Sequence, residues 1–404
     1  MRVSVVDLAG NVVASLDAQD SWSLHEIRLQ ISESSGRLQL MRSRLFYGTA
    51  ELRPGVSLAA AGVSDGSFLT LVMTASGRII SASKDRAAKI WSLDSGVCLC
   101  TLEGHGHDVQ SAIFSPDGTL ALTASSDRTA KVWSTDSGEC LCTLEGHTSF
   151  LQRATFAPDG NFVLTASYDC TAKVWCPQSG RCLQSFGGNR QGIAAFSPDS
   201  TLVITAASGC TAKIWKVSSG KCKRILEGHG ALVMSAVFSP EGKLALTSSA
   251  DSTANIWNAD SGSRLHKLEG HRQEVVSAMF SPGGESVLTA SSDRTVRIWS
   301  AASGECLSTL SGHGGDAPWA MFSPSGKLVL TASHGRTVKV FSADSGECVQ
   351  TFKGHTGEVH SAVFSPDGSL LLTASEDSTA KIWNVESGEC QRTLADHAEP
   401  VLSA

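Results

Sequence analysis

An aromatic residue closes a strand-like segment eight times in this chain, at almost constant spacing. Successive gaps are 42, 42, 40, 42, 42, 42 and 42 residues, between Trp91, Trp133, Trp175, Trp215, Trp257, Trp299, Phe341 and Trp383. A period near 40 residues is typical of proteins that stack one supersecondary unit many times. Residues 77–404 are therefore predicted to form a repeat array, and such arrays mostly present binding surfaces.

One unit, His105 to Gly146, shows how the repeat is built. HDVQSAIFSPDG alternates apolar and polar residues and ends in a turn, TLALTASSD and RTAKVWS read as two more strands, and ECLCTLEGH follows the turn TDSG. No part of the unit has a sustained helical apolar period. Four short antiparallel strands with polar turns are typical of one blade of a β-propeller.

The spacing of GH, about 28 residues and then KVW or KIW resembles the WD40 repeat. The resemblance implies a buried network in each blade, in which Trp donates a hydrogen bond to a Ser and His donates to an Asp. Five units carry the whole set: His105/Ser125/Asp127/Trp133, His147/Ser167/Asp169/Trp175, His229/Ser249/Asp251/Trp257, His271/Ser291/Asp293/Trp299 and His355/Ser375/Asp377/Trp383. We interpret these histidines as structural, because each has its partners within its own unit.

Two units depart from this pattern, and the first unit is incomplete. One has Asn189, Ala207 and Gly209 in place of His, Ser and Asp, and the other has Gly335 for Asp and Phe341 for Trp. The first unit lacks its first strand, while the C-terminal tail ADHAEPVLSA aligns with such a strand. The tail should therefore close the ring, with His397 completing a network with Ser83, Asp85 and Trp91. This gives eight blades, with seven as the alternative if one degraded unit is not a full blade.

Residues 1–73 lack the repeat signature and are predicted to form a separate domain, joined to the propeller by residues 74–76. MRVSVVDLAGNVVASL reads as a hairpin, SWSLHEIRLQISESSG as a helix, and RLFYG and SFLTLVM as strands. This order resembles the ubiquitin-like β-grasp fold. The resemblance implies a recognition patch at Leu8, Leu45 and Val72, and a docking role rather than conjugation, because no Gly-Gly follows Met73.

The composition of the chain limits the kinds of partner that are expected. The net charge of −6 and the absence of Lys/Arg clusters argue against direct nucleic-acid binding. No apolar stretch approaches membrane-spanning length, so no membrane contact is expected. Seven of the twelve cysteines recur at one repeat position, one per unit, which predicts free thiols and a reducing compartment, cytoplasmic or nuclear. No CxxC pair, phosphate-binding loop or GxSxG motif is present, so we expect no cofactor, metal or catalytic site.

The sequence thus predicts a non-enzymatic scaffold, monomeric within larger complexes, that binds proteins or peptides. The alternative is a factor for RNA or ribonucleoprotein assembly. In WD40 rings the top face is lined by the residues three and five after the repeat His and by the residue before the turn Asp. These positions predict an apolar arc and an acidic arc that favours basic partners. The apolar arc is Phe150, Tyr168, Leu232, Met234 and Val276, and the acidic arc is Asp108, Asp316, Glu358 and Glu376 with His360 among them.

Overall fold

A computed structural model of the 404-residue chain shows two compact units, Met1–Arg78 and Ile79–Ala404. The structure describes residues 2–6, 12–17, 43–47, 50–51, 68–73, 77–207, 210–311, 319–332 and 335–404. For the strands before residue 77, and for 189–192 and 207, it describes the backbone alone. These ranges contain strands and turns but no helix, and thus no helix that is long and apolar enough to cross a membrane.

The first unit contains one five-stranded sheet in the order β2-β1-β5-β3-β4. Strand β1 pairs antiparallel with β2 and parallel with β5, and β3 pairs antiparallel with β5 and β4. The helix predicted at residues 21–36 lies outside the described residues. The strands are β1 Arg2–Val6, β2 Val12–Asp17, β3 Ser43–Tyr47, β4 Ala50–Glu51 and β5 Phe68–Met73.

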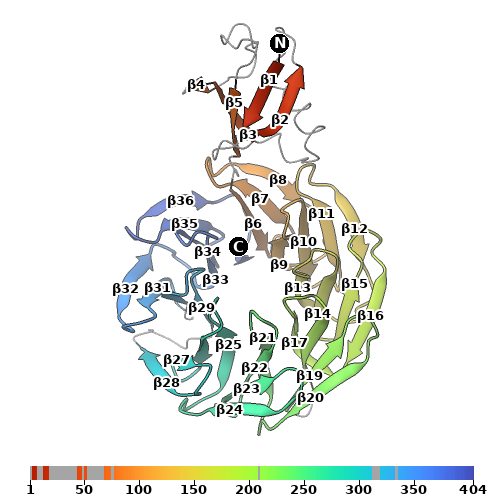
Figure 1. Ribbon diagram of the computed structural model, residues 1–404, viewed down its shortest axis with the longest axis vertical. Helices are drawn as coiled ribbons and strands as arrows, with labels where there is room; N and C mark the ends of the chain where they lie inside the picture. Colours follow the sequence, from red (N-terminus) through yellow and green to blue (C-terminus); the bar gives the residue numbers. More distant parts are fainter. Residues whose placement is uncertain are drawn as a thin grey trace. The chain divides into compact units, whose positions relative to one another are not determined.

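The second unit is a ring of eight four-stranded antiparallel sheets, the blades of a propeller (Figure 1). The eight aromatic positions of the sequence each lie on the third strand of a blade, so the prediction of eight blades is confirmed. Blade 1 consists of β37 Val401–Ser403, β6 Arg78–Ser83, β7 Ala88–Ser92 and β8 Cys98–Leu102. Blade 2 is β9 Val109–Phe114, β10 Leu120–Ser125, β11 Ala130–Ser134 and β12 Cys140–Leu144; blade 3 is β13 Leu151–Phe156, β14 Val163–Ser167, β15 Thr171–Trp175 and β16 Cys182–Gly187; blade 4 is β17 Asn189–Phe196, β18 Leu202–Ala207, β19 Thr211–Lys216 and β20 Cys222–Glu227.

The remaining blades repeat the same meander, with the first strand innermost and the fourth on the circumference (Figure 1). Blade 5 is β21 Val233–Phe238, β22 Leu244–Ser249, β23 Ala254–Asn258 and β24 Arg264–Leu268; blade 6 is β25 Val275–Phe280, β26 Ser286–Ser291, β27 Val296–Ser300 and β28 Cys306–Leu310. Blade 7 is β29 Trp319–Phe322, β30 Leu328–Ala332, β31 Thr337–Ser342 and β32 Cys348–Lys353; blade 8 is β33 Val359–Phe364, β34 Leu370–Ser375, β35 Ala380–Asn384 and β36 Cys390–Leu394. We name the four strands of each blade a to d in this order.

Both ends of the propeller sequence meet in blade 1. Strand β37 lies antiparallel to β6, with Val401 opposite Ser83. The Ser83 hydroxyl donates to the carbonyl of Glu399, and the backbone N–H of Lys84 donates to the carbonyl of Pro400. These contacts span more than 300 residues of sequence, so the ring is closed without a covalent link between its first and last strands.

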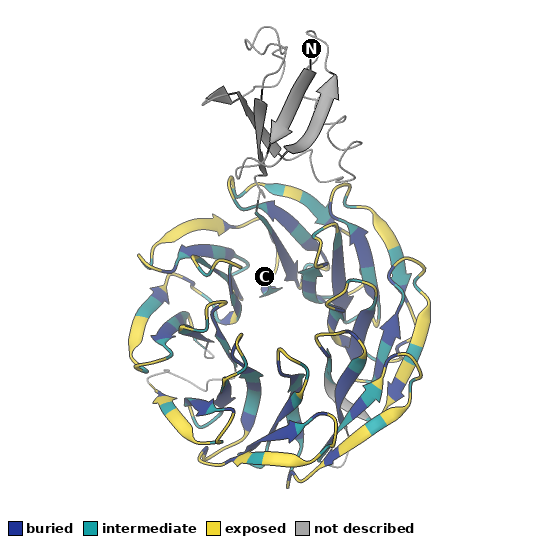
Figure 2. Ribbon diagram, in the orientation of Figure 1, coloured by how far each residue is buried: buried dark blue, intermediate teal, exposed yellow. Residues whose placement is uncertain are grey.

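The core of the propeller lies between neighbouring blades. One buried cluster joins Leu122, Val132 and Leu144 of blade 2 to Phe156 and Trp175 of blade 3, and other clusters repeat this arrangement around the ring. Burial is highest in the two middle strands b and c and lowest in strand d (Figure 2). Each blade therefore buries its apolar faces only against its neighbours, as expected for a repeat array.

Strand d of every blade carries a β-bulge near its start. In blade 2 Trp133 pairs with Cys140 and Val132 with Cys142, which leaves Leu141 as the extra residue. Leu141 is 54% exposed, and equivalent residues in other blades, such as Leu99 and Leu307, are also exposed. A bulge on an exposed edge strand discourages pairing with another chain. The twelve cysteines are free thiols, and most of those at the start of strand d are exposed.

Candidate binding surfaces of the propeller

A hydrogen-bonded chain crosses each intact blade from strand c to the turn before strand a. In blade 2, Trp133 Nε1 donates to Thr123 Oγ1 over 2.8 Å, and Thr123 Oγ1 lies 2.7 Å from His105 Nε2. His105 Nδ1 lies 2.8 Å from Asp127 Oδ2. Because Trp only donates and the carboxylate only accepts, the Thr hydroxyl must donate to Nε2 and His Nδ1–H to Asp127. With a neutral imidazole, every member of this chain thus has a hydrogen-bond partner.

The same chain occurs in blades 3, 5, 6 and 8, with Thr165, Thr247, Thr289 and Thr373 in the place of Thr123. Blade 1 forms the same chain of hydrogen bonds with residues from both ends of the propeller sequence. Trp91 Nε1 donates to Ser81 Oγ, which lies 2.7 Å from His397 Nε2, and His397 Nδ1 lies 2.7 Å from Asp85 Oδ2. The assignment of these histidines to structural networks therefore agrees with the geometry of all six blades.

The predicted role of Ser125 and Ser83 in this chain is wrong. The hydroxyl that accepts from Trp is two residues earlier, on Thr123 in blade 2 and Ser81 in blade 1. At this point strand a carries an extra residue, Gln110, because Ala124 pairs with Ser111 and Ser125 with Val109. The Ser125 hydroxyl instead donates to the His107 carbonyl and accepts from the Asp127 N–H, and Ser83 holds the equivalent turn.

Burial sets the ionisation of these networks. Burial lowers the pKa of His105 below its usual value, although the hydrogen bond and charge of Asp127 oppose this. Burial alone would raise the pKa of Asp127, but hydrogen bonds from Thr129, the Gly106 N–H and His105 outweigh it and lower the pKa to about 2. The pair is therefore a neutral imidazole beside a carboxylate, and it holds the d–a and b–c turns together at one end of the blade.

The turns of the ring divide into two faces. In an antiparallel meander the b–c and d–a turns lie at one end of the strands, which we call the top face, and the a–b and c–d turns lie at the other, the bottom face. On the top face the residue three after the repeat His accepts a backbone hydrogen bond from the residue before the turn Asp. This bond joins Phe150 to Tyr168, Glu358 to Glu376 and Leu232 to Ala250.

Two of the predicted pairs thus come together on single blades. Phe150 and Tyr168 of blade 3 are 55% and 49% exposed, and their ring centroids lie 6.1 Å apart in an edge-to-face arrangement. Glu358 and Glu376 share the equivalent place on blade 8, where Glu376 and the neighbouring His360 are exposed. Two large aromatic side chains exposed side by side are typical of a binding surface rather than of an unused one.

The other predicted residues are spread over separate blades. Leu232 and Met234 of blade 5, Val276 of blade 6 and Asp108 of blade 2 are half-buried. Asp316, the predicted member from blade 7, and Gly209 of blade 4 lie outside the described residues, as do the side chains of Asn189 and Ala207 of blade 4. The apolar positions therefore do not form one continuous surface among the described residues.

The prediction missed several charged top-face residues, of which Arg86 and Arg128 lie outside the three counted positions and Lys84, directly before Asp85, lies at one of them. Exposed Lys84 and Arg86 of blade 1 lie between the acidic positions of blades 8 and 2, and Arg128 is exposed on blade 2. Glu274 occupies one of the three positions within the apolar arc, so the rule itself could have found it. A cleft of about 300 Å³ between blades 2 and 3 is lined by Arg128, His107 and Phe150 among others. The apolar arc thus contains a carboxylate, and cations lie among the residues of the acidic arc.

The patch predicted on the first unit is only partly described. Leu8 lies outside the described residues. Leu45 is in β3 and Val72 in β5, on paired strands, but Leu45 pairs with Leu71 and Val72 with Arg44. Among the described residues of the whole chain, no group of three or more His, Cys, Asp and Glu side chains could hold a metal ion.

Comparisons with known proteins identify the class. The family model described as "WD domain, G-beta repeat" matches residues 96–134, 138–176, 180–216, 220–258, 262–300, 304–342 and 346–384, which together exceed half of the chain. The chain therefore belongs to the WD40 family. Propellers of this family serve mainly as scaffolds for protein interactions, and the eight-bladed ring fits that role.

Individual relatives add little beyond the repeat. The nuclear distribution protein PAC1 of Arthroderma otae is 42% identical over 45 residues, which are 11% of this chain and 10% of that protein. The chain thus spans only a small part of this relative. The crystal structure of the computationally designed Ika8 protein is 27% identical, with a TM-score of 0.68, over 76% of this chain and 93% of that one.

Proposed function

We propose that this protein is a non-enzymatic adaptor in which the top face of the propeller holds a peptide or protein client. The observation that carries the proposal is the exposed pair Phe150 and Tyr168. Both residues stand on blade 3, whose network joins Trp175, Thr165, His147 and Asp169 without a gap. A rigid support lets large aromatic side chains bind with little loss of conformational entropy.

The acidic pair on blade 8 supports a client with basic residues. Glu358 and Glu376 lie close enough for their backbones to hydrogen-bond, and a pair of carboxylates attracts Lys or Arg and steers its approach. Lys84 and Arg86 on the adjacent blade 1 reduce this attraction for a client that extends towards them. The basic side chain is therefore expected close to blade 8 itself, next to an apolar anchor.

The first unit is proposed to be a ubiquitin-like domain that docks a receptor of the ubiquitin–proteasome type. Its sheet order, with the first and last strands parallel and adjacent, supports this reading. Docking is proposed through one face of this sheet, and because Leu45 and Val72 occupy register positions of opposite faces, that face cannot include both of them. Such an adaptor would bring a client to its receptor in the cytoplasm or nucleus, as a monomer within a larger complex.

Paired substitutions test the client site. Phe150→Ala with Tyr168→Ala should weaken client binding mainly through faster dissociation, because it removes buried contact area. Glu358→Lys with Glu376→Lys should mainly slow association and reduce its salt dependence. The client is first recovered by purifying the tagged full chain from its native cells, with and without RNase. Unchanged binding in both variants would place the client elsewhere, and RNase-sensitive recovery of ribonucleoproteins would favour the RNA-assembly alternative.

A further inference from the structure

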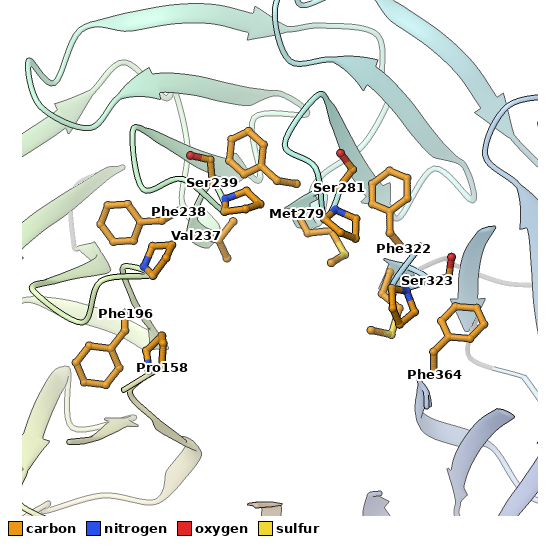
Figure 3. Close-up of a pocket in the computed structure, with 16 residues that line it drawn as sticks. Pro158, Phe196, Val237, Phe238, Ser239, Met279, Ser281, Phe322, Ser323 and Phe364 are labelled. Atoms are coloured by element: carbon orange, nitrogen blue, oxygen red, sulfur yellow. The ribbon is translucent and has the colours of Figure 1, made fainter. Parts of the chain in front are cut away.

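A cavity of the propeller opens on the bottom face, opposite the proposed client site. It has a volume of about 590 Å³ and is lined by sixteen residues of blades 3 to 8, none of which is charged. The lining residues come from the end of strand a and from the Phe-Ser-Pro or Phe-Ala-Pro sequence that begins the a–b turn; blades 5, 6 and 7 supply all of these positions. Figure 3 shows these side chains in an arc around the open mouth of the ring, from Pro158 and Phe196 to Phe364.

The polar atoms of the lining are already occupied. Ser239 and Ser281 are buried, and their hydroxyls accept the backbone N–H of Leu244 and Ser286 in their own turns. The proline rings of successive blades pack against the turn glycine of the next blade, as Pro240 does against Gly284. The surface offered to an occupant is therefore apolar, without a polar group that would fix a charged or strongly hydrogen-bonding ligand.

Two methionines in the lining of this cavity are not needed to form the repeat, because other blades have other residues at the same position. The residue before the final Phe of strand a is Ile113 in blade 2, Thr155 in blade 3 and Ala195 in blade 4, but Met279 in blade 6 and Met321 in blade 7. All of these positions are half-buried. Methionine is flexible and polarizable and is frequent on surfaces that adapt to bound peptides.

A ring of carboxylates surrounds the cavity. The a–b turns carry six exposed carboxylates, at Asp117, Asp159, Asp199, Glu241, Glu285 and Asp367, against the two cations Lys243 and Lys327. The c–d turns of the same face add nine exposed carboxylates and two exposed cations. The described turns of the top face, in contrast, expose seven carboxylates and six cations. The negative field is therefore concentrated on the bottom face.

We infer that the bottom face is a second interaction surface, which binds a segment of a partner protein with apolar side chains at its centre and Lys or Arg on both sides. The apolar centre enters the cavity beside Met279 and Met321, and the basic flanks lie over the carboxylates of the a–b turns. An apolar surface rimmed by one sign of charge is typical of a site for such a partner. The acidic rim repels nucleic acid and anionic lipid surfaces, which leaves a basic polypeptide as the occupant.

The probe for this surface is a set of immobilised twelve-residue peptides, tested against the full-length protein. Peptides with three central Leu, Met or Phe residues and Lys/Arg flanks should bind, and the same peptides with Glu flanks or a Ser centre should not. Binding should fall by about tenfold between low and physiological salt, because the flanks act through exposed charges. Failure of all basic-flanked peptides to bind, or equal binding of the Glu-flanked set, would overturn the inference.

Matched variants locate the site. Glu241→Lys with Glu285→Lys reverses two charges on the bottom of blades 5 and 6, and association should slow by about tenfold. The control, Glu269→Lys with Glu274→Lys, makes the same change in net charge in the top-face turn that joins these blades, and should stay within about twofold of the wild type. An equal loss in the control would overturn the inference. If the Lys variant melts early, Glu241→Gln with Glu285→Gln provides the same comparison.

The apolar part is tested by Met279→Thr with Met321→Thr. Thr155 occupies the equivalent position in blade 3, so threonine suits the strand, and a melting curve verifies the fold. The variant should release the basic-flanked peptides about tenfold faster, since it shortens the apolar contact. Unchanged release would overturn the inference. Phe150→Ala with Tyr168→Ala should leave this binding intact, so failure of the top-face proposal and failure of this one are distinguishable.

Discussion

Blades 2 and 4 have the same four-strand meander but differ in what holds their tryptophan. In blade 2, Trp133 is 2% exposed, and its ring lies 6.2 Å from His105 in an edge-to-face contact. In blade 4, Trp215 is only half-buried, and its ring neighbour is Phe186 of blade 3, at 5.3 Å. Trp215 Nε1 still donates to Thr205 Oγ1. The strand c tryptophan and its threonine therefore persist when the signature His and Asp are replaced, while the tight burial does not.

The difference separates two roles of the repeat signature. The apolar periods of strands a to c form the sheet, since blade 4 keeps all four strands. The His and Asp side chains join the d–a turn to the b–c turn, where Gly106 N–H and Thr129 N–H both donate to Asp127. We infer that the networks mainly fix the top-face turns, and thus the binding residues that those turns carry.

Removing the closing strand should have the largest effect on stability. Deleting residues 395–404 removes His397 and the fully buried Val401 and leaves Trp91 and Ser81 without a network. Lost burial and hydrogen bonds together should cost several kcal/mol, on the order of a large core truncation. Thermal denaturation measures this. A melting temperature within about 2 °C of the full chain would show that closure contributes little.

The tryptophans of the two blades should differ in their cost of truncation. Trp133→Ala should destabilise the protein by about 3–5 kcal/mol, because loss of a fully buried ring leaves a cavity and leaves Thr123 Oγ1 without its indole donor. Trp215→Ala should cost at least about 1 kcal/mol less, since less apolar area is buried there. Urea denaturation of both variants gives the comparison. Equal costs would show that the network adds nothing to the burial of the ring.

The hydroxyl on strand b gives a smaller and more specific test. Thr123→Val removes the acceptor of Trp133 Nε1 and the donor to His105 Nε2 while keeping the shape of the side chain, and should cost about 1–3 kcal/mol. Thr205→Val in blade 4 leaves a single group unpaired and should cost less. Ser125→Ala serves as the control for the position that the signature predicts. A greater loss for Ser125→Ala than for Thr123→Val would contradict the assignment of the chain through Thr123.

The sequence was sufficient for the blade count but not for the network, for a physical reason. The aromatic period depends on strand c alone, and nothing in the turns disturbs it. Most repeats, in contrast, carry hydroxyls at two positions of strand b two residues apart, as in Thr123 and Ser125. Alternation places both on one face, so the residue pattern does not distinguish the one that accepts from Trp133, which is Thr123. The bulge of strand d, which exposes Leu141, is likewise a backbone feature without a residue signal.

The top-face residues show a different limit. Counting positions after the repeat His located Phe150 beside Tyr168 and Glu358 beside Glu376, because those turns have constant length and one backbone bond joins them. It overlooked Arg86 and Arg128, which lie outside the three counted positions, and Lys84, which directly precedes the turn Asp85 and so lies at a counted one. It also overlooked the bottom face, because the Phe-Ser-Pro turn reads as a structural motif in each repeat. Its apolar character becomes a surface only when six blades bring these turns around one opening.

Acid should weaken the intact blades through their histidines, which gives the smallest and last test. Burial lowers the pKa of His105, His147, His229, His271, His355 and His397. The unfolded chain therefore binds more protons than the folded one just below pH 6.5, so stability is full above about pH 6.5 and falls as the pH decreases. The lowered pKa values of Asp127, Asp169 and Asp293, each about 2, add a second loss of stability between about pH 4 and 2.

Melting temperatures at constant ionic strength should thus decrease from pH 7 to pH 5. His105→Gln should make the decrease in stability with pH less steep, by at most the contribution of one bound proton. His360→Gln, a change at an exposed histidine, serves as the control variant. A melting temperature that stays constant or rises from pH 7 to pH 5 would mean that the networks hold charged imidazoles, in which His105 Nε2–H donates to Thr123 Oγ1.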